Sequence, residues 1–74
     1  MLVAECIKCS RRFYARTPRM LERDMILHYS VHFCEERFEG VYRNLYRNIC
    51  VSAVFRLVKE GFDVRRFYRV FEIS

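Results

Sequence analysis

Residues 6–32 read CIKCSRRFYARTPRMLERDMILHYSVH, and they carry the strongest structural signal in the chain. It holds Cys6 and Cys9 in a Cys-x2-Cys pair, and His28 and His32 in a His-x3-His pair. Histidines four residues apart on a helix lie one turn apart on the same face, so their rings can converge. Two thiolates and two imidazoles are a ligand set that zinc prefers in proteins. The spacing therefore predicts one zinc ion per chain, bound by Cys6, Cys9, His28 and His32.

The residues between these pairs predict a hairpin and a helix. Residues 2–6 and 12–15 read as two short strands joined by the cysteine turn. Thr17 followed by Pro18 is typical of a helix start, with threonine as the N-cap and proline at the first helical position. We expect this helix to run from residue 18 to about residue 33 or 36, with Gly40 beyond it as a stop.

These residues resemble the two-cysteine, two-histidine zinc finger. The resemblance covers residues 3–32, and Phe13 and Met25 stand where that family places its core residues. It implies a zinc-clamped hairpin and helix that bind DNA. Eighteen residues separate Cys9 from His28, where about twelve are usual. Family positions that contact bases would hold Leu21, Asp24 and Leu27, which suit base edges poorly, so the three-bases-per-finger mode is not carried over.

The two remaining cysteines leave the ligand set open. Cys34 lies two residues after His32 and could replace it as the fourth ligand. A set of Cys6, Cys9, Cys34 and Cys50 is an alternative, as is a chain without metal. Cys50 lies in an apolar segment and is expected to be a small core residue.

The C-terminal half predicts two more helices. Residues 41–60 show helical spacing of apolar side chains, although 49–58 are apolar nearly all round and a strand competes there. Gly61 would end this helix, and Asp63 would cap a third helix over 64–73. Residues 54–74 also weakly resemble the first two helices of a helix-turn-helix domain. The expected fold is a small, mostly helical α+β protein, a single domain over 1–74, with a zinc-finger-like part (1–36) and a helical extension (41–74).

The charge of the chain points to an anionic partner. Of its 74 residues, 14 are Lys or Arg and 9 are Asp or Glu, for a net charge of +5. Arginine and aromatic residues are interleaved in residues 11–16 and 65–69, a pattern that suits phosphates and bases. The arginines expected to contact nucleic acid are Arg11, Arg12, Arg16, Arg19, Arg65, Arg66 and Arg69.

These features predict a zinc-binding transcriptional regulator that binds DNA, as a duplex, through arginine–phosphate contacts. The alternative is a protein-interaction module, with a homodimer formed through helix 41–60. An enzyme is not expected, since four protein ligands leave zinc no open position. No apolar run is long enough to cross a membrane, and no signal peptide is visible. We therefore expect an intracellular protein, in the cytoplasm or the nucleus.

Overall fold

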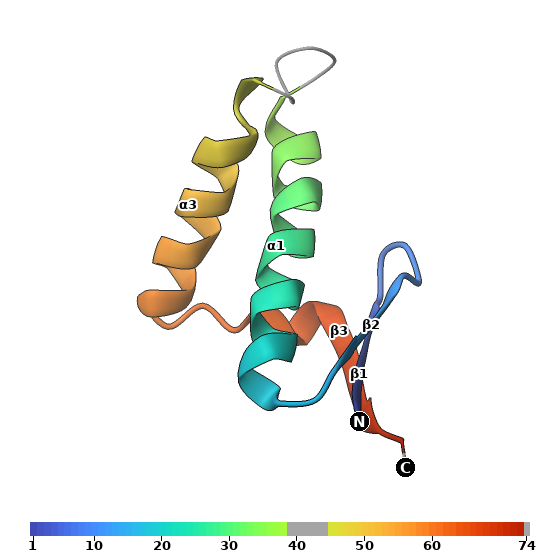
Figure 1. The fold of residues 1–74 in the computed structure, drawn as a ribbon. Coiled ribbons are helices and arrows are strands. Elements are labelled where there is room, and N and C mark those ends of the chain that lie inside the picture. The colour runs from blue at the N-terminus through green and yellow to red at the C-terminus, as the bar shows by residue number, and fades with distance from the viewer. Residues whose placement is uncertain (39–44, 74) are drawn as a thin grey trace. The chain divides into compact units, whose positions relative to one another are not determined.

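The computed structural model describes residues 1–38 and 45–73. In chain order they form β1 (Leu2–Cys6), β2 (Arg12–Ala15), α1 (Pro18–Arg37), α3 (Arg47–Lys59), a 3₁₀ helix (Val64–Phe67) and β3 (Tyr68–Glu72) (Figure 1). The chain divides into two compact units. Unit 1 consists of residues 1–25 and the C-terminal segment from Asp63, and unit 2 is Ile26–Phe62.

The predicted hairpin and first helix are confirmed. β1 and β2 pair antiparallel with the register Leu2↔Ala15, over the residues expected to be strands. α1 begins at Pro18, and the backbone N–H of Met20 donates to Thr17 Oγ1 at 3.2 Å, as expected of an N-cap. The helix ends at Arg37, and the predicted stop at Gly40 lies outside the described residues.

The predicted helix over 64–73 is wrong. Only Val64–Phe67 is helical, as a single 3₁₀ turn, and Asp63 caps it by accepting from the backbone N–H of Arg65 at 3.1 Å. Tyr68–Glu72 is instead the strand β3. The described residues therefore hold two α-helices, and the second helix of the helix-turn-helix resemblance is absent from residues 63–73.

Pairing between the two ends of the chain explains this difference. β3 runs antiparallel to β1 from Leu2↔Glu72 to Cys6↔Tyr68, so the sheet order is β2-β1-β3. A two-stranded hairpin leaves one edge of β1 with unpaired backbone groups. The C-terminal residues satisfy that edge, and these hydrogen bonds prevail over the helical spacing of their side chains.

One face of this sheet packs against the first half of α1 within unit 1. Ala4, Tyr68, Leu21 and Met25 are buried in this core. The Tyr68 hydroxyl donates to the carbonyl of Met25 at 2.8 Å, and Phe13 meets the Tyr68 ring edge-on with centroids 6.3 Å apart. The hydrogen bond satisfies a buried hydroxyl and ties β3 to α1.

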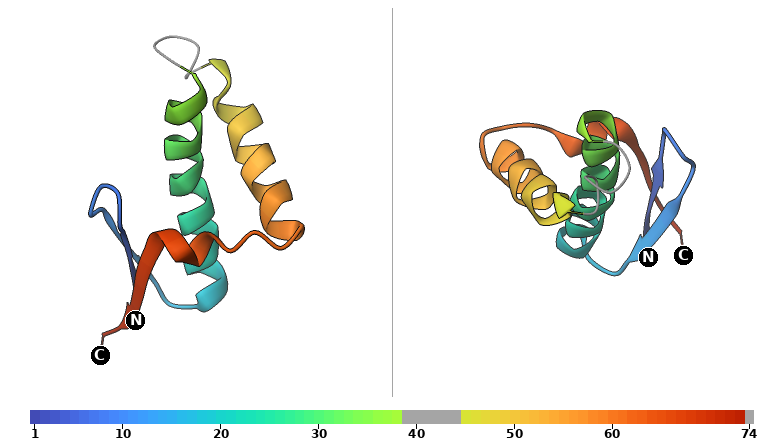
Figure 2. Two further views of the ribbon diagram at one scale, coloured as in Figure 1. Left: turned by 180° about the vertical axis from the view of Figure 1, so that it is seen from behind. Right: turned by 90° about the horizontal axis from the view of Figure 1, so that it is seen from above.

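Unit 2 pairs the second half of α1 with α3, and Figure 2 shows these helices side by side. The helix predicted over 41–60 is observed at Arg47–Lys59, which settles 49–58 as helix, while residues 41–44 lie outside the described residues. Gly61 ends it with φ +107°, and the N–H of Phe62 donates to the Leu57 carbonyl at 2.9 Å. A left-handed residue after the helix is the predicted C-terminal cap.

Candidate functional site

The two cysteines of the predicted metal site lie at the tip of the β1–β2 hairpin. Cys6 is the last residue of β1, and the turn is closed by a hydrogen bond from the Ser10 N–H to the Cys6 carbonyl at 2.8 Å. Ser10 has φ +63°, a left-handed conformation that lets the chain reverse within four residues. Cys6 is buried and Cys9 is exposed. The turn therefore presents one thiol from inside the fold and one from its surface.

The two histidines lie one turn apart on α1, as their spacing predicts. Their rings are perpendicular, with centroids 4.7 Å apart, and the two Nε2 atoms are 3.1 Å apart. Nδ1 of His32 lies 3.8 Å from a carboxylate oxygen of Glu35. Histidines that bind metals usually donate their second ring N–H to such a group. Sequence reasoning missed Glu35, although its position three residues after His32 places it on the same helix face.

The four predicted ligands come together. Their sulfur and nitrogen atoms all lie within 4.8 Å of one another. Ligand atoms around a tetrahedral zinc ion are roughly 3.3–3.8 Å apart, so small side-chain adjustments would close this set around one ion. Two soft thiolates with two imidazoles form the donor set that favours zinc over magnesium or calcium. The residues thus fit zinc.

The chain matches no protein-family model, no curated protein and no solved structure. The resemblance to the two-cysteine, two-histidine zinc finger therefore stands on the ligand cluster, the β-hairpin and the helix. The residues inserted between Cys9 and His28 are accommodated by an early start of the helix, since α1 already begins at Pro18. Leu21 is buried, so it cannot serve at a base-contacting position of that family.

Cys34 and Cys50 lie together in the core of unit 2. Both are buried, and their side chains are hydrogen-bonded to one another. The residues that the structure describes give one group of possible metal ligands, and neither of these cysteines belongs to it. The prediction of Cys50 as a core residue is therefore consistent with its place in the fold.

This buried pair makes the free energy of unfolding decrease with pH in the alkaline range. Burial, together with the hydrogen bond that the Cys50 thiol donates to Cys34, raises the pKa of Cys50 from 9.0 to about 11. Above pH 9.0 the unfolded thiol ionises while the folded one keeps its proton. The free energy of unfolding is therefore unaffected below about pH 9 and falls as the pH rises to about 11. Urea unfolding at a series of pH values measures this, and Cys50→Ala should flatten the decline; an unchanged slope would refute it.

All seven predicted phosphate-binding arginines lie in unit 1, and every one is exposed. They come from opposite ends of the chain, and the pairing of β3 with β1 brings those ends into one unit. Arg65 forms an exposed ion pair with Glu22 at 3.9 Å. Unit 1 holds nine Lys and Arg against five Asp and Glu, a net charge of +4, whereas unit 2 carries +1.

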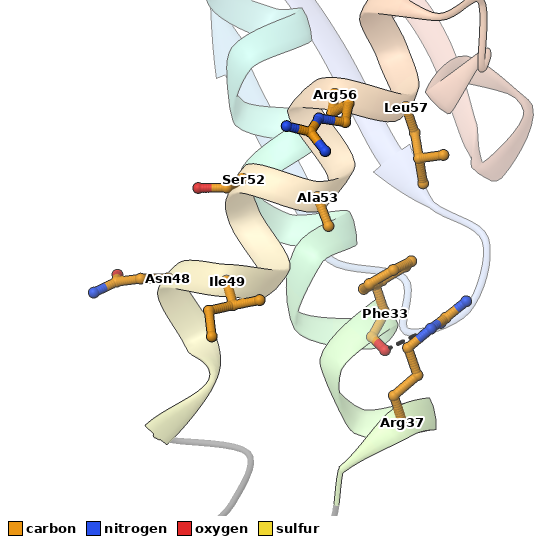
Figure 3. A pocket seen from close by; sticks show the side chains of 8 residues that line it. All are labelled: Phe33, Arg37, Asn48, Ile49, Ser52, Ala53, Arg56 and Leu57. Atoms are coloured by element: carbon orange, nitrogen blue, oxygen red, sulfur yellow. Dashed lines mark hydrogen bonds between the residues drawn. The ribbon is translucent and has the colours of Figure 1, made fainter.

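Unit 2 has a groove of about 640 Å³ between the end of α1 and α3 (Figure 3). The Arg37 guanidinium lies 3.7 Å from the centroid of the Phe33 ring at one side of it. Ile49 contributes an exposed apolar side chain. The lining residues are Phe33, Arg37, Asn48, Ile49, Ser52, Ala53, Arg56 and Leu57. In the part of the chain that the structure describes, neither helix is long and apolar enough to cross a membrane.

Proposed function

We propose that the chain is a zinc-stabilised nucleic-acid-binding protein that regulates transcription by binding duplex DNA. The observation that carries this proposal is the concentration of positive charge in the unit that contains the cysteine turn. Seven exposed arginines and a net charge of +4 belong to unit 1. Clustered arginines bind phosphates by releasing counterions from the nucleic acid.

Zinc has a structural role in this proposal. Cys6, Cys9, His28 and His32 would hold it with four protein ligands, and such closed sites stabilise folds rather than activate water. A binding role is therefore favoured over an enzymatic one. Thiolate ligands must stay reduced, which fits the cytoplasm or the nucleus.

The test is the salt dependence of DNA binding. For Arg65→Ala combined with Arg66→Ala, we expect weaker binding to duplexes of any sequence. The slope of log affinity against log salt concentration should fall by about 1.8, about 0.9 for each lost phosphate contact. Fluorescence anisotropy with a labelled duplex at several salt concentrations measures both quantities.

A matched control removes the same charge from unit 2. The double variant Arg47→Ala, Lys59→Ala changes two exposed cations on α3 and should leave the slope nearly unchanged. If both double variants lose affinity equally, binding reflects net charge alone and the arginines of unit 1 form no specific surface. If the wild-type chain binds no duplex, the DNA proposal is wrong.

The groove in unit 2 favours a second candidate function, a protein-interaction or dimerisation module. Leu45 and Ile49 are 72% and 59% exposed, and exposed apolar side chains that lie together are candidate contacts for a partner. Sedimentation equilibrium separates the two candidates. Self-association that persists at high salt in a chain without DNA affinity would favour this alternative.

A further inference from the structure

The outer face of the sheet, opposite α1, carries two aromatic rings in one row. Tyr14 on β2 and Phe71 on β3 are both register partners of Val3 on β1. Directly opposed residues of antiparallel strands project to the same side, so these three side chains share a face. Strands lie about 4.8 Å apart, which puts the two aromatic residues roughly 10 Å apart across the sheet.

The next row on this face is charged. Arg12 and Arg69 are the register partners of Glu5, again one on each outer strand. Arg12 donates to the Glu5 carboxylate at 3.2 Å, and its guanidinium lies 6.0 Å from the centroid of the Phe71 ring. Two guanidinium groups thus flank a single carboxylate, and the row keeps a positive charge beside the aromatic row.

The rings of Tyr14 and Phe71 are open to solvent, although Val3 between them is buried. Tyr14 is 54% and Phe71 is 40% exposed, whereas Val3 is 1% exposed. The sheet buries its other face against α1, where the Tyr68 hydroxyl bonds to Met25. Exposed aromatic rings on a sheet, next to arginines, form the arrangement on which unpaired bases stack.

We propose that this stacking face, formed by Tyr14, Phe71, Arg12 and Arg69, binds single-stranded nucleic acid. One base stacks on each ring, and the arginines pair with the adjacent phosphates. This inference rests on the proposed nucleic-acid function and assigns unpaired strands, rather than a duplex, to this face of the sheet. Bases in a duplex already stack on each other, so a duplex cannot offer their faces to these rings.

The first experiment compares alanine variants in anisotropy titrations with labelled oligo(dT) and oligo(U). Tyr14→Ala and Phe71→Ala should each weaken binding about 5- to 100-fold, the loss expected for one stacked base. Tyr14→Phe keeps the ring and should bind almost as the wild type does. Tyr46→Ala removes an exposed tyrosine from unit 2 and is the matched control. Circular dichroism and zinc content verify that each variant is folded.

A second measurement reports stacking directly. The chain has no tryptophan, so Phe71→Trp introduces a single fluorophore on the stacking face. A base stacked on that ring should quench its fluorescence, whereas Tyr46→Trp should remain unquenched. Equal quenching by both oligonucleotides indicates stacking without a sugar contact, and tighter binding of oligo(U) assigns the site to RNA.

The outcomes separate this inference from the proposed function. If the Tyr14 and Phe71 variants bind single strands as the wild type does, or if only a duplex binds, the stacking face is wrong while the nucleic-acid function stands. If neither single strands nor a duplex binds, both proposals fail. Loss of single-strand affinity confined to the two aromatic variants supports the stacking face.

Discussion

Cys9→Ser is expected to abolish zinc binding and to unfold the chain. Cys9 is exposed, so the substitution itself removes little packing, and its effect reports the lost metal ligand. Zinc contributes about 10–16 kcal/mol of apparent folding free energy in finger peptides. That exceeds or matches the total stability of about 5–15 kcal/mol of an ordinary domain. Far-UV circular dichroism and zinc content per chain measure both effects.

The other two cysteines supply the control. Cys34 lies in the core of unit 2, outside the ligand cluster. The Cys34→Ala variant should therefore keep one zinc ion per chain even if its free energy of unfolding falls. Removing zinc from the wild-type chain with a chelator should unfold it as Cys9→Ser does. Added zinc should refold the chelated wild-type chain but not the Cys9→Ser variant. A Cys9→Ser chain that stays folded and keeps its zinc would refute the four-ligand site.

Met25→Ala is expected to cost about 2–5 kcal/mol of unfolding free energy. Met25 is 1% exposed and has the largest fully buried side chain among residues 1–38 and 45–73. It lies three residues before His28 on α1, and its carbonyl accepts the Tyr68 hydroxyl bond. Truncation would leave a cavity next to that bond. Because zinc binding and folding are coupled, the variant should also release zinc at a lower chelator concentration than the wild type does.

Met20→Ala is the matched control on the same helix. Met20 is 55% exposed, so removing its side chain should change stability by less than about 0.5 kcal/mol. Thermal unfolding in the presence of excess zinc compares the two variants under one condition. Equal destabilisation by both would mean that α1 does not bury its Met25 face against the sheet.

Local signals account for the elements that could be predicted. The hairpin, the start of α1 at Pro18 and the caps at Asp63 and Gly61 depend on bonds between residues a few positions apart. The metal ligands are also predicted by a local signal. Two residues separate Cys6 from Cys9 and three separate His28 from His32, and these short spacings identify the members of each pair. The spacing does not by itself choose between His32 and Cys34, and only the fold separates them.

The C-terminal strand shows what the sequence could not reveal. Residues 64–73 have apolar side chains at helical spacing, a pattern that fits a helix much better than a strand. The choice depends on β1, whose free edge lies at the opposite end of the chain. The placement of Phe71 beside Tyr14 follows from that pairing and could not be inferred from either segment alone.

Local patterns in the sequence are sufficient to predict the hairpin, the helix that follows it and the Cys-x2-Cys and His-x3-His pairs. Contacts between distant segments are needed to form β3 from residues 68–72, to bring the Cys34 and Cys50 thiols together, and to gather seven arginines from the two ends of the chain in unit 1. The two groups of features differ in the range of the interactions that form them. Turns and caps are satisfied by neighbouring residues, whereas a strand edge is satisfied by whichever segment the fold brings to it.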